Sequence, residues 1–122
     1  EVIVPQQSDV PVVKWASECL YEKLLRRGVR IFERKDQMLH SKVMVIDDEW
    51  SVVGSCNLDP RSLRLNAEFL AVIRSRAAAD QIARLCSYEM QQSEEVLLEH
   101  CHRRRWWQRL RNRLAWSLRR WL

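Results

Sequence analysis

A histidine and a lysine lie two residues apart in an otherwise apolar stretch of this 122-residue chain, at His40 and Lys42. Ser55 and Asn57 follow at the same spacing a little further on. Alternate side chains of an extended strand point to one face, so the two members of each pair should lie together. An imidazole can transfer protons, while an ammonium group and neutral donors can hold phosphate oxygens. The four residues therefore predict chemistry on a phosphodiester.

Taken singly, each of these side chains is more often structural. A lone histidine or lysine on a strand is usually exposed or hydrogen-bonded, and Asn57 is a common turn residue. Asp47 stands in an acidic triplet typical of a solvated turn, and Cys56 should pack on the side opposite Ser55. The prediction of a site depends on the whole set occurring at fixed intervals, with Gly54 allowing close approach of the backbone.

The full pattern resembles a known signature. It reads His40-x-Lys42-x4-Asp47-x6-Gly54-Ser55-x-Asn57, and it is similar to the HKD motif of the phospholipase D superfamily at every position. Glu68 lies where members of this family carry the acid that hydrogen-bonds the motif histidine. The stretch GSCNLDPRSLRLNAEF resembles bacterial cardiolipin synthases of the B type, above all their second half. The resemblance covers residues 1–100 of the chain.

This resemblance implies a mechanism that needs no cofactor and no metal. One motif histidine forms a phosphohistidine, and a second histidine protonates the departing alcohol. The roles implied here are general acid–base catalysis by His40, ring orientation by Glu68, phosphate binding by Lys42, Ser55 and Asn57, and support of the site by Asp47.

In the family two HKD motifs build one site, and this sequence has one. The chain is therefore expected to be inactive until an upstream half of the same polypeptide, or a second copy in a homodimer, supplies the other. The start at Glu1 favours the first source. The first expectation is a phosphatidyltransferase of the cardiolipin synthase type acting on a phosphatidylglycerol-like phospholipid. The alternatives are a homodimeric phosphodiesterase or nuclease, a phospholipase D that hydrolyses phospholipid, and a silent membrane-binding module.

Positive charge is concentrated at the C-terminus. Residues 103–122 hold eight arginines and no acid, whereas residues 1–102 carry three more acidic than basic side chains. A body without a basic surface argues against nucleic acid as the partner. The segment 103–122 is predicted to be a basic, tryptophan-rich helix on an anionic membrane, which would place the protein peripherally on the cytoplasmic face of the bacterial inner membrane. The membrane-binding residues would be Trp106, Trp107, Leu110, Leu114, Leu118 and Trp121.

Two alternatives to membrane contact remain for this segment. Its apolar stripe could pack on the protein body, or its arginines could form a nucleic-acid-binding arm. The scattered cysteines, without paired spacing, disfavour zinc and disulfides, and the adjacent residues of His100-Cys101-His102 would point apart on a helix.

The hydrophobic pattern predicts the order β-α-β-β-β-β-α. Strands are expected at residues 2–4, 29–33, 42–47, 51–55 and 67–73, and helices at 10–27, capped by Ser8-Asp9, and 78–101. The fold class is thus α/β, as an α+β sandwich. A phospholipase D-like half-domain at residues 1–102 would have a mixed β-sheet flanked by helices, with the amphipathic helix following at 103–122.

Overall fold

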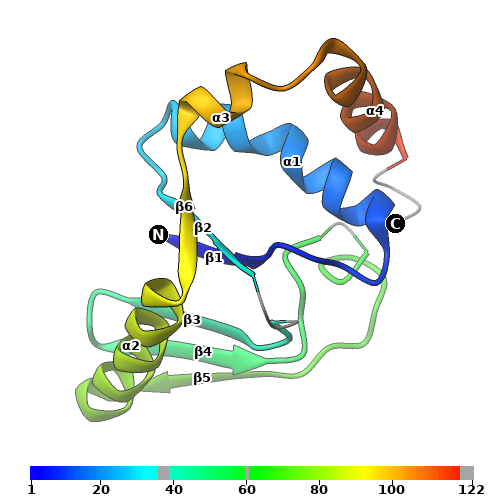
Figure 1. Ribbon diagram of the computed structural model, residues 1–122. Coiled ribbons are helices and arrows are strands. Elements are labelled where there is room, and N and C mark those ends of the chain that lie inside the picture. The colour runs from blue at the N-terminus through cyan, green and yellow to red at the C-terminus, as the bar shows by residue number, and fades with distance from the viewer. Residues whose placement is uncertain (36–38, 60, 119–122) are drawn as a thin grey trace. The chain divides into compact units, whose positions relative to one another are not determined.

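The structure, a computed structural model, describes residues 1–35, 39–59 and 61–118. The chain divides into two compact units. Unit 1 comprises Glu1–Leu39 and Gln92–Leu122, and unit 2 comprises His40–Gln91. Each unit contains a three-stranded sheet and at least one helix, as Figure 1 shows. The predicted mixed α and β class is confirmed, although the expected single sheet is divided into two.

The sheet of unit 1 joins strands from both ends of the chain. β1 (Val2–Pro5) pairs in parallel with β2 (Ile31–Arg34), and β2 pairs antiparallel with β6 (Ser93–Val96). Ile31 in the central strand and Val96 opposite it are both buried. β2 begins with two adjacent apolar residues, Ile31 and Phe32, and both are buried. A central strand that is covered on both faces can bury adjacent side chains in this way.

α1 (Pro11–Leu25) connects the two parallel strands of unit 1. Pro11 occupies the first helical turn, where a missing N–H costs nothing. Gly28 follows the helix with a φ of 81°, a left-handed conformation that favours glycine at a helix end. The residue before the helix is Val10, whose N–H donates to the Ser8 hydroxyl, so the predicted Ser8-Asp9 cap is displaced to the preceding turn.

One buried polar cluster ties α1 to β2. The Lys14 ammonium donates to both the Glu33 carboxylate and the Tyr21 hydroxyl, and Tyr21 donates to Glu33 at 2.9 Å. Burial, together with the charge of Glu33, raises the pKa of Tyr21. The phenol therefore stays protonated and serves as a donor.

The residues from 92 onward form β6, α3 (Leu98–His102) and α4 (Trp106–Ser117). The predicted helix over 78–101 is therefore confirmed as far as Gln91 and wrong at residues 93–96, and residues 98–101 lie in the separate helix α3. Residues 93–96 are strand because they pair with β2, where Glu95 meets Arg30 at 2.9 Å. Pairing with a neighbouring strand outweighs the helical propensity of this glutamate-rich segment.

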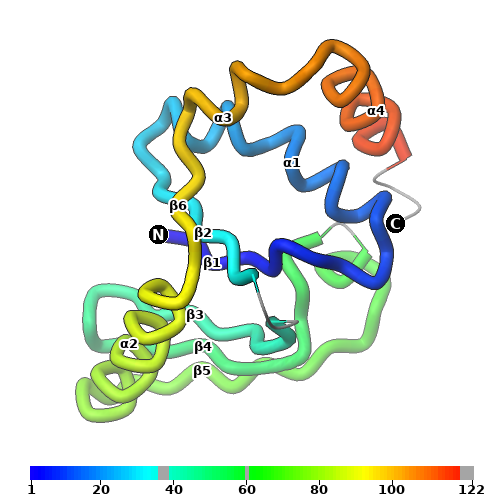
Figure 2. The backbone as a smooth tube through the Cα atoms, in the orientation of Figure 1, coloured from blue at the N-terminus to red at the C-terminus, as the bar shows by residue number. Residues whose placement is uncertain are grey.

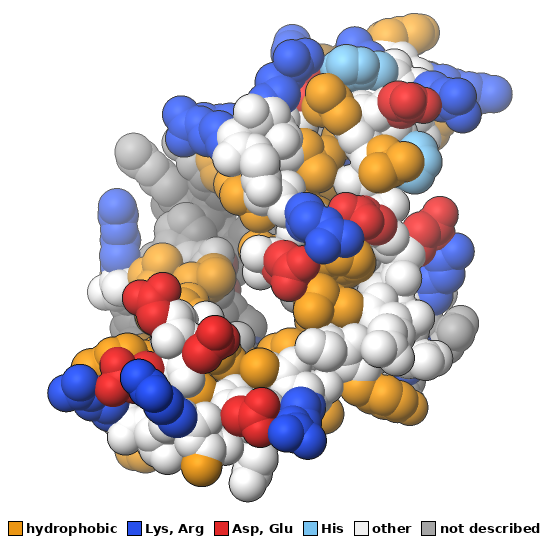
Figure 3. Space-filling model, turned by 90° about the vertical axis from the view of Figure 1, so that its left-hand side faces the viewer, with side chains coloured by type: hydrophobic (Ala, Val, Ile, Leu, Met, Phe, Trp, Pro, Cys, Tyr) orange, Lys and Arg blue, Asp and Glu red, His pale blue; other side chains and the backbone are white. Residues whose placement is uncertain are grey.

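The C-terminal segment, predicted to be an amphipathic helix, forms α4. α4 packs along α1 within unit 1 (Figure 2). The predicted residue Trp121 lies outside the described residues. On the face seen in Figure 3, basic and histidine side chains gather over α3, just before α4 begins. The basic character predicted from the sequence is thus a surface of unit 1.

Glu18 of α1 holds α4 in place. Its carboxylate accepts a hydrogen bond from Asn112 at 2.9 Å and lies 3.5 Å from the Arg104 guanidinium and 3.9 Å from that of Arg111. Arg104 also donates to the Glu18 carbonyl at 3.1 Å. Asn112 and Ala115 are buried at this contact. α4 therefore turns a largely polar side toward α1.

Unit 2 is an antiparallel sheet with one helix. β3 (Lys42–Ile46), β4 (Trp50–Gly54) and β5 (Leu70–Arg74) follow one another as a meander, and α2 (Arg76–Gln91) packs against all three. Ala79 of this helix is completely buried.

We expect Glu18→Gln to lower the free energy of unfolding by about 1.5–3 kcal/mol, the range for hydrogen bonds to charged groups. The reason is that two arginines lose their shared carboxylate in a largely buried place. Urea denaturation measures the change. Glu22→Gln is the matched control, since Glu22 pairs with Arg26 on the exposed side of α1 and should contribute little. Equal stability of Glu18→Gln and the unchanged protein would contradict the anchoring role.

Candidate active site

Three strand ends meet at one edge of the unit 2 sheet. Lys42 begins β3 and is opposite Gly54 at the end of β4, which in turn is opposite Leu70 at the start of β5. Because the strands are antiparallel, the residues before β3, after β4 and before β5 come to the same edge. These are the segments that carry His40, Ser55 and Glu68. The register of the meander thus brings together residues up to 28 positions apart.

His40 and Lys42 lie at the entrance to β3. His40 is exposed and precedes β3, which begins at Lys42 as the predicted strand did. The prediction that His40 and Lys42 share one face of a strand therefore does not apply to His40. The Lys42 ammonium donates to the His40 carbonyl oxygen at 2.8 Å. This contact folds the lysine back along the chain and keeps its positive charge beside the histidine.

Ser55 joins the second and third segments. Its hydroxyl donates to a Glu68 carboxylate oxygen at 2.6 Å and accepts the N–H of Phe69 at 3.1 Å. The Ser55 N–H donates to the Phe69 carbonyl at 3.0 Å. In this structure the Ser55 hydroxyl donates its hydrogen bond to Glu68, and phosphate binding by Ser55 stays a prediction.

Glu68 is held as a carboxylate. Asn66 donates to its second oxygen at 3.3 Å and also to the Ser62 hydroxyl. The hydrogen bond from Ser55 lowers the pKa of Glu68, with smaller contributions from Ser62, Asn66 and the charge of Lys42. None of the hydrogen bonds given by residues 39–59 and 61–118 joins Glu68 to the His40 ring, so ring orientation stays a prediction.

Sequence reasoning missed the loop that supports Glu68. The Asp59 carboxylate accepts the backbone N–H groups of Arg61 at 2.9 Å and Ser62 at 2.7 Å, and Ser62 is buried. An aspartate that bonds backbone two and three residues ahead is a turn former, and the Asp-Pro dipeptide at 59–60 is a recognisable signal of it. This turn brings Ser62 within reach of Asn66.

Asn57 and Cys56 follow Ser55 on the same loop. Asn57 is exposed and follows the end of β4, and an amide can donate hydrogen bonds to an anion. Cys56 is partly buried, and its thiol contacts the Asn57 carbonyl at 3.4 Å. Phosphate binding by Lys42 and Asn57 is compatible with these positions.

Gly54 is required by the closeness of β5. A Cβ at this position would overlap the Phe69 carbonyl oxygen and lie 2.8 Å from a methyl carbon of Leu70. No larger residue fits without moving β5, and with it the segment that carries Glu68. The glycine of the motif is thus a packing requirement of the site.

Asp47 is not brought to this edge. It follows Ile46 at the far end of β3, about 16 Å from Lys42 at the rise of a strand. Asp47 and Asp48 both have a φ of 51°, and the Glu49 N–H donates to the Ile46 carbonyl at 3.2 Å. This is a type I′ turn, in which aspartate is tolerated at positive φ. In this structure Asp47 forms the hairpin turn between β3 and β4, and its support of the site stays a prediction.

Metal-ligand clusters and membrane-spanning helices are both absent from the described residues. Within residues 1–35, 39–59 and 61–118, no three histidine, cysteine or acidic side chains converge as metal ligands. No helix in those ranges has the length and apolar character needed to cross a bilayer.

Asp47→Gly should retain the positive φ and leave stability nearly unchanged, whereas Asp47→Val should cost about 1–3 kcal/mol because a β-branched residue is strained there. Urea denaturation of both variants tests this. A folded Asp47→Gly protein that loses all function in the assay described below would instead assign chemistry to the carboxylate.

Ser55→Ala should raise the pKa of Glu68 toward its ordinary value, because the hydrogen bond that stabilises the carboxylate is lost. Carboxyl-carbon NMR titration of the two proteins measures the shift. Ser87→Ala is the control, since the Ser87 hydroxyl bonds its own helix at the Ala83 carbonyl. If the pKa of Glu68 is the same in Ser55→Ala and in the unchanged protein, the hydrogen bond from Ser55 is not what lowers it.

Known proteins similar to this chain are cardiolipin synthases. The chain is 35% identical over 119 residues to Cardiolipin synthase B of Escherichia coli, covering 94% of this chain and 28% of that protein. It is 34% identical to Cardiolipin synthase A of Proteus mirabilis, over 94% of this chain and 24% of that one. The chain thus spans about a quarter of the length of these relatives. No solved structure matches it.

The family match includes the strand ends that carry the candidate site, and it also includes β1 and α1. The family described as "Cardiolipin synthase, PLD-like domain" matches residues 1–90, which is most of the chain and includes every residue from His40 to Glu68. The resemblance found in the motif is therefore confirmed over most of the chain: the chain belongs to the phospholipase D-like domain family of cardiolipin synthases.

Proposed function

We propose that this chain supplies one half of a phosphatidyl-transfer site and, completed by a second HKD motif, forms cardiolipin from phosphatidylglycerol-like lipids. The observation that carries the proposal is the meeting of His40, Lys42, Asn57 and Glu68 at one edge of the unit 2 sheet. Membership of the cardiolipin synthase family supports the choice of substrate class. The second motif would come from a longer polypeptide or from another copy of the chain.

His40 is assigned to proton transfer. In the first step the histidine of the other motif attacks phosphorus, the bond from phosphorus to the departing alcohol breaks, and the His40 imidazolium gives that alcohol its proton. In the second step neutral His40 takes the proton of the incoming hydroxyl. The oxygen of that hydroxyl then attacks phosphorus, and the phosphorus–nitrogen bond breaks.

Lys42 and Asn57 are assigned to the non-bridging oxygens of the phosphate. An ammonium group attracts the anion from any direction, whereas an amide gives a directed hydrogen bond. The hydrogen bond from Lys42 to the His40 carbonyl keeps this positive charge next to the proton-transferring residue. Both groups also stabilise the extra negative charge that develops on the phosphate oxygens during attack.

Glu68 is assigned to the His40 ring. A carboxylate that accepts an imidazole N–H fixes the tautomer and stabilises the imidazolium. Ser55 and Asn66 support this role, because their hydrogen bonds hold Glu68 in place and lower its pKa. The carboxylate is therefore ionised under the conditions in which His40 must change its protonation state.

The protein is proposed to act at a membrane surface. Phosphatidylglycerol and its product are bilayer lipids, so a transferase must reach them there. The arginine-rich segment after residue 102 would attract the anionic cytoplasmic leaflet, at about 1 kcal/mol for each arginine near the surface.

His40→Ala should abolish cardiolipin formation, and Glu68→Gln should lower the rate about 100-fold, within the range for acid–base assistance. The assay uses phosphatidylglycerol liposomes and two proteins. One is the chain alone, and the other is Cardiolipin synthase B of Escherichia coli in which this chain replaces the matching 119 residues. If only the chimera forms cardiolipin, a separate first motif completes the site. If the isolated chain also forms cardiolipin, two copies of the chain complete it.

His102→Ala is the matched control, because His102 is an exposed histidine that contacts Glu22 in unit 1. Its chimera should form cardiolipin at the unchanged rate. A full rate from His40→Ala, or inactivity of every protein whose circular dichroism shows it folded, would refute the proposal.

A further inference from the structure

α4 exposes its apolar side. Because its polar residues meet Glu18 on α1, the large apolar side chains of this helix remain exposed, and all of them except Trp106 line the margin of a groove along α1. The exposed fractions of these side chains are 77% for Trp106, 43% for Trp107, 50% for Leu110, 60% for Leu114 and 50% for Leu118. A contiguous apolar patch of this kind marks a surface that another molecule covers.

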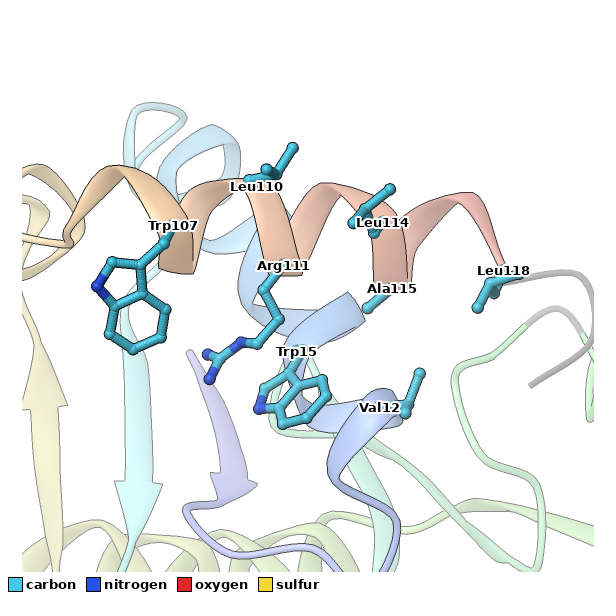
Figure 4. A pocket seen from close by; sticks show the side chains of 8 residues that line it. All are labelled: Val12, Trp15, Trp107, Leu110, Arg111, Leu114, Ala115 and Leu118. Atoms are coloured by element: carbon cyan, nitrogen blue, oxygen red, sulfur yellow. The ribbon is translucent and has the colours of Figure 1, made fainter.

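The patch borders a groove between α4 and α1. The groove has a volume of about 390 Å³ and is lined from α1 by Val12 and Trp15. In Figure 4, Trp107 and Arg111 project from α4 toward α1, while Leu110 and Leu114, which also line the groove, lie at its outer margin. Pockets of about 300–1,000 Å³ with apolar walls and few polar groups are typical of small-molecule sites. Trp15 could not be assigned to this site from the sequence, because it lies 92 residues before Trp107.

Arg111 is the polar group of this groove. Its guanidinium lies 4.4 Å from the centre of the Trp15 ring and 5.8 Å from that of Trp107, so that it is stacked between two indoles (Figure 4). Both distances are within the range of cation–π attraction. Nε and Nη2 of Arg111 also bond the Asn112 side-chain oxygen, at 3.3 and 3.2 Å. These contacts hold a cation in the wall of an apolar groove.

The surroundings of the groove are positively charged. Arg104 and Arg111 share the single carboxylate of Glu18, which leaves an excess of one positive charge at the base of α4. Residues 103–118 contain six arginines and no acid. A protein segment seated here could contribute acids, but an anionic phospholipid matches both features in one molecule. Its acyl chain suits the apolar walls and its phosphate suits the arginines, with tryptophans at the depth of the headgroups.

We propose that the α1–α4 groove binds an acyl chain of an anionic phospholipid, with the headgroup phosphate at the surrounding arginines. The inference rests on the proposed function, because a phosphatidyl-transfer site needs a lipid surface as its source of substrate. It goes further by naming the binding surface and by adding Val12 and Trp15 of α1 to residues of the C-terminal segment.

The experiment compares binding of the full chain to vesicles with and without phosphatidylglycerol in a phosphatidylcholine background. Binding is measured by co-sedimentation, and insertion by quenching of tryptophan fluorescence with phosphatidylglycerol brominated on its acyl chains. The unchanged chain should bind the anionic vesicles more tightly and be quenched by them. The double variant Leu110→Asn, Leu114→Asn should bind about tenfold more weakly, because it loses apolar contact without a change of charge.

Leu85→Asn is the matched control. Leu85 is a similarly exposed leucine, on α2 of unit 2, and its variant should bind like the unchanged chain. Circular dichroism and the urea midpoint establish that each variant is folded. His40→Ala should also bind normally, so a failure of turnover and a failure of lipid binding are recognised separately.

Three outcomes would overturn the proposal: no preference for anionic vesicles, equal binding by the double variant, or binding without quenching by brominated chains. Sedimentation velocity identifies a fourth. If the unchanged chain dimerises and the double variant is monomeric with vesicle binding unchanged, the groove holds a second copy and not a lipid.

Discussion

The site depends on the register of one antiparallel meander. Lys42, Gly54 and Leu70 are cross-strand neighbours, and a slip of one residue would turn every side chain of a strand to the opposite face. Two features, one at each end of the sheet, fix this register. Asp47 and Asp48 adopt the positive φ that a tight hairpin requires, and Gly54 lets β5 approach where a side chain would prevent it. Asp47 and Gly54 of the motif therefore help to determine where the segments that carry His40 and Glu68 lie.

Electrostatics at the active edge follow from this geometry. The Ser55 hydroxyl donates a hydrogen bond to Glu68, which lowers the pKa of that carboxyl and keeps it charged. The same hydroxyl accepts the Phe69 N–H, so that it joins the end of β4 to the start of β5. Lys42 brings a positive charge to the same edge through its bond to the His40 carbonyl. An ionised acid and a cation on segments that come to the same edge as a histidine suit a group that would gain and lose a proton within one reaction cycle. His40 itself is exposed.

Unit 1 shows how one buried acid can reverse the expected orientation of an amphipathic helix. An apolar stripe ordinarily faces the protein core. In α4 the opposite side is buried, because Glu18 on α1 offers a charged partner to Arg104, Arg111 and Asn112. A carboxylate in that position would be costly without such partners, and each arginine that pairs with it removes part of the cost. The consequence is a protein surface on which tryptophan and leucine are exposed beside arginine, as on helices that lie at lipid interfaces.

The sequence by itself determined the motif, the family and most of the element order, because these depend on local pattern and on residue types at fixed spacing. β1, α1 and the three strands of unit 2 lie within a few residues of their predicted positions. Only the tertiary structure decided that residues 93–96 form a strand, since that requires pairing with β2 some 60 positions earlier. It likewise decided that Ser55 holds Glu68, that Asp47 makes a turn, and that α4 buries its polar side. Each of these outcomes depends on a partner distant in sequence, and no local periodicity records such a partner.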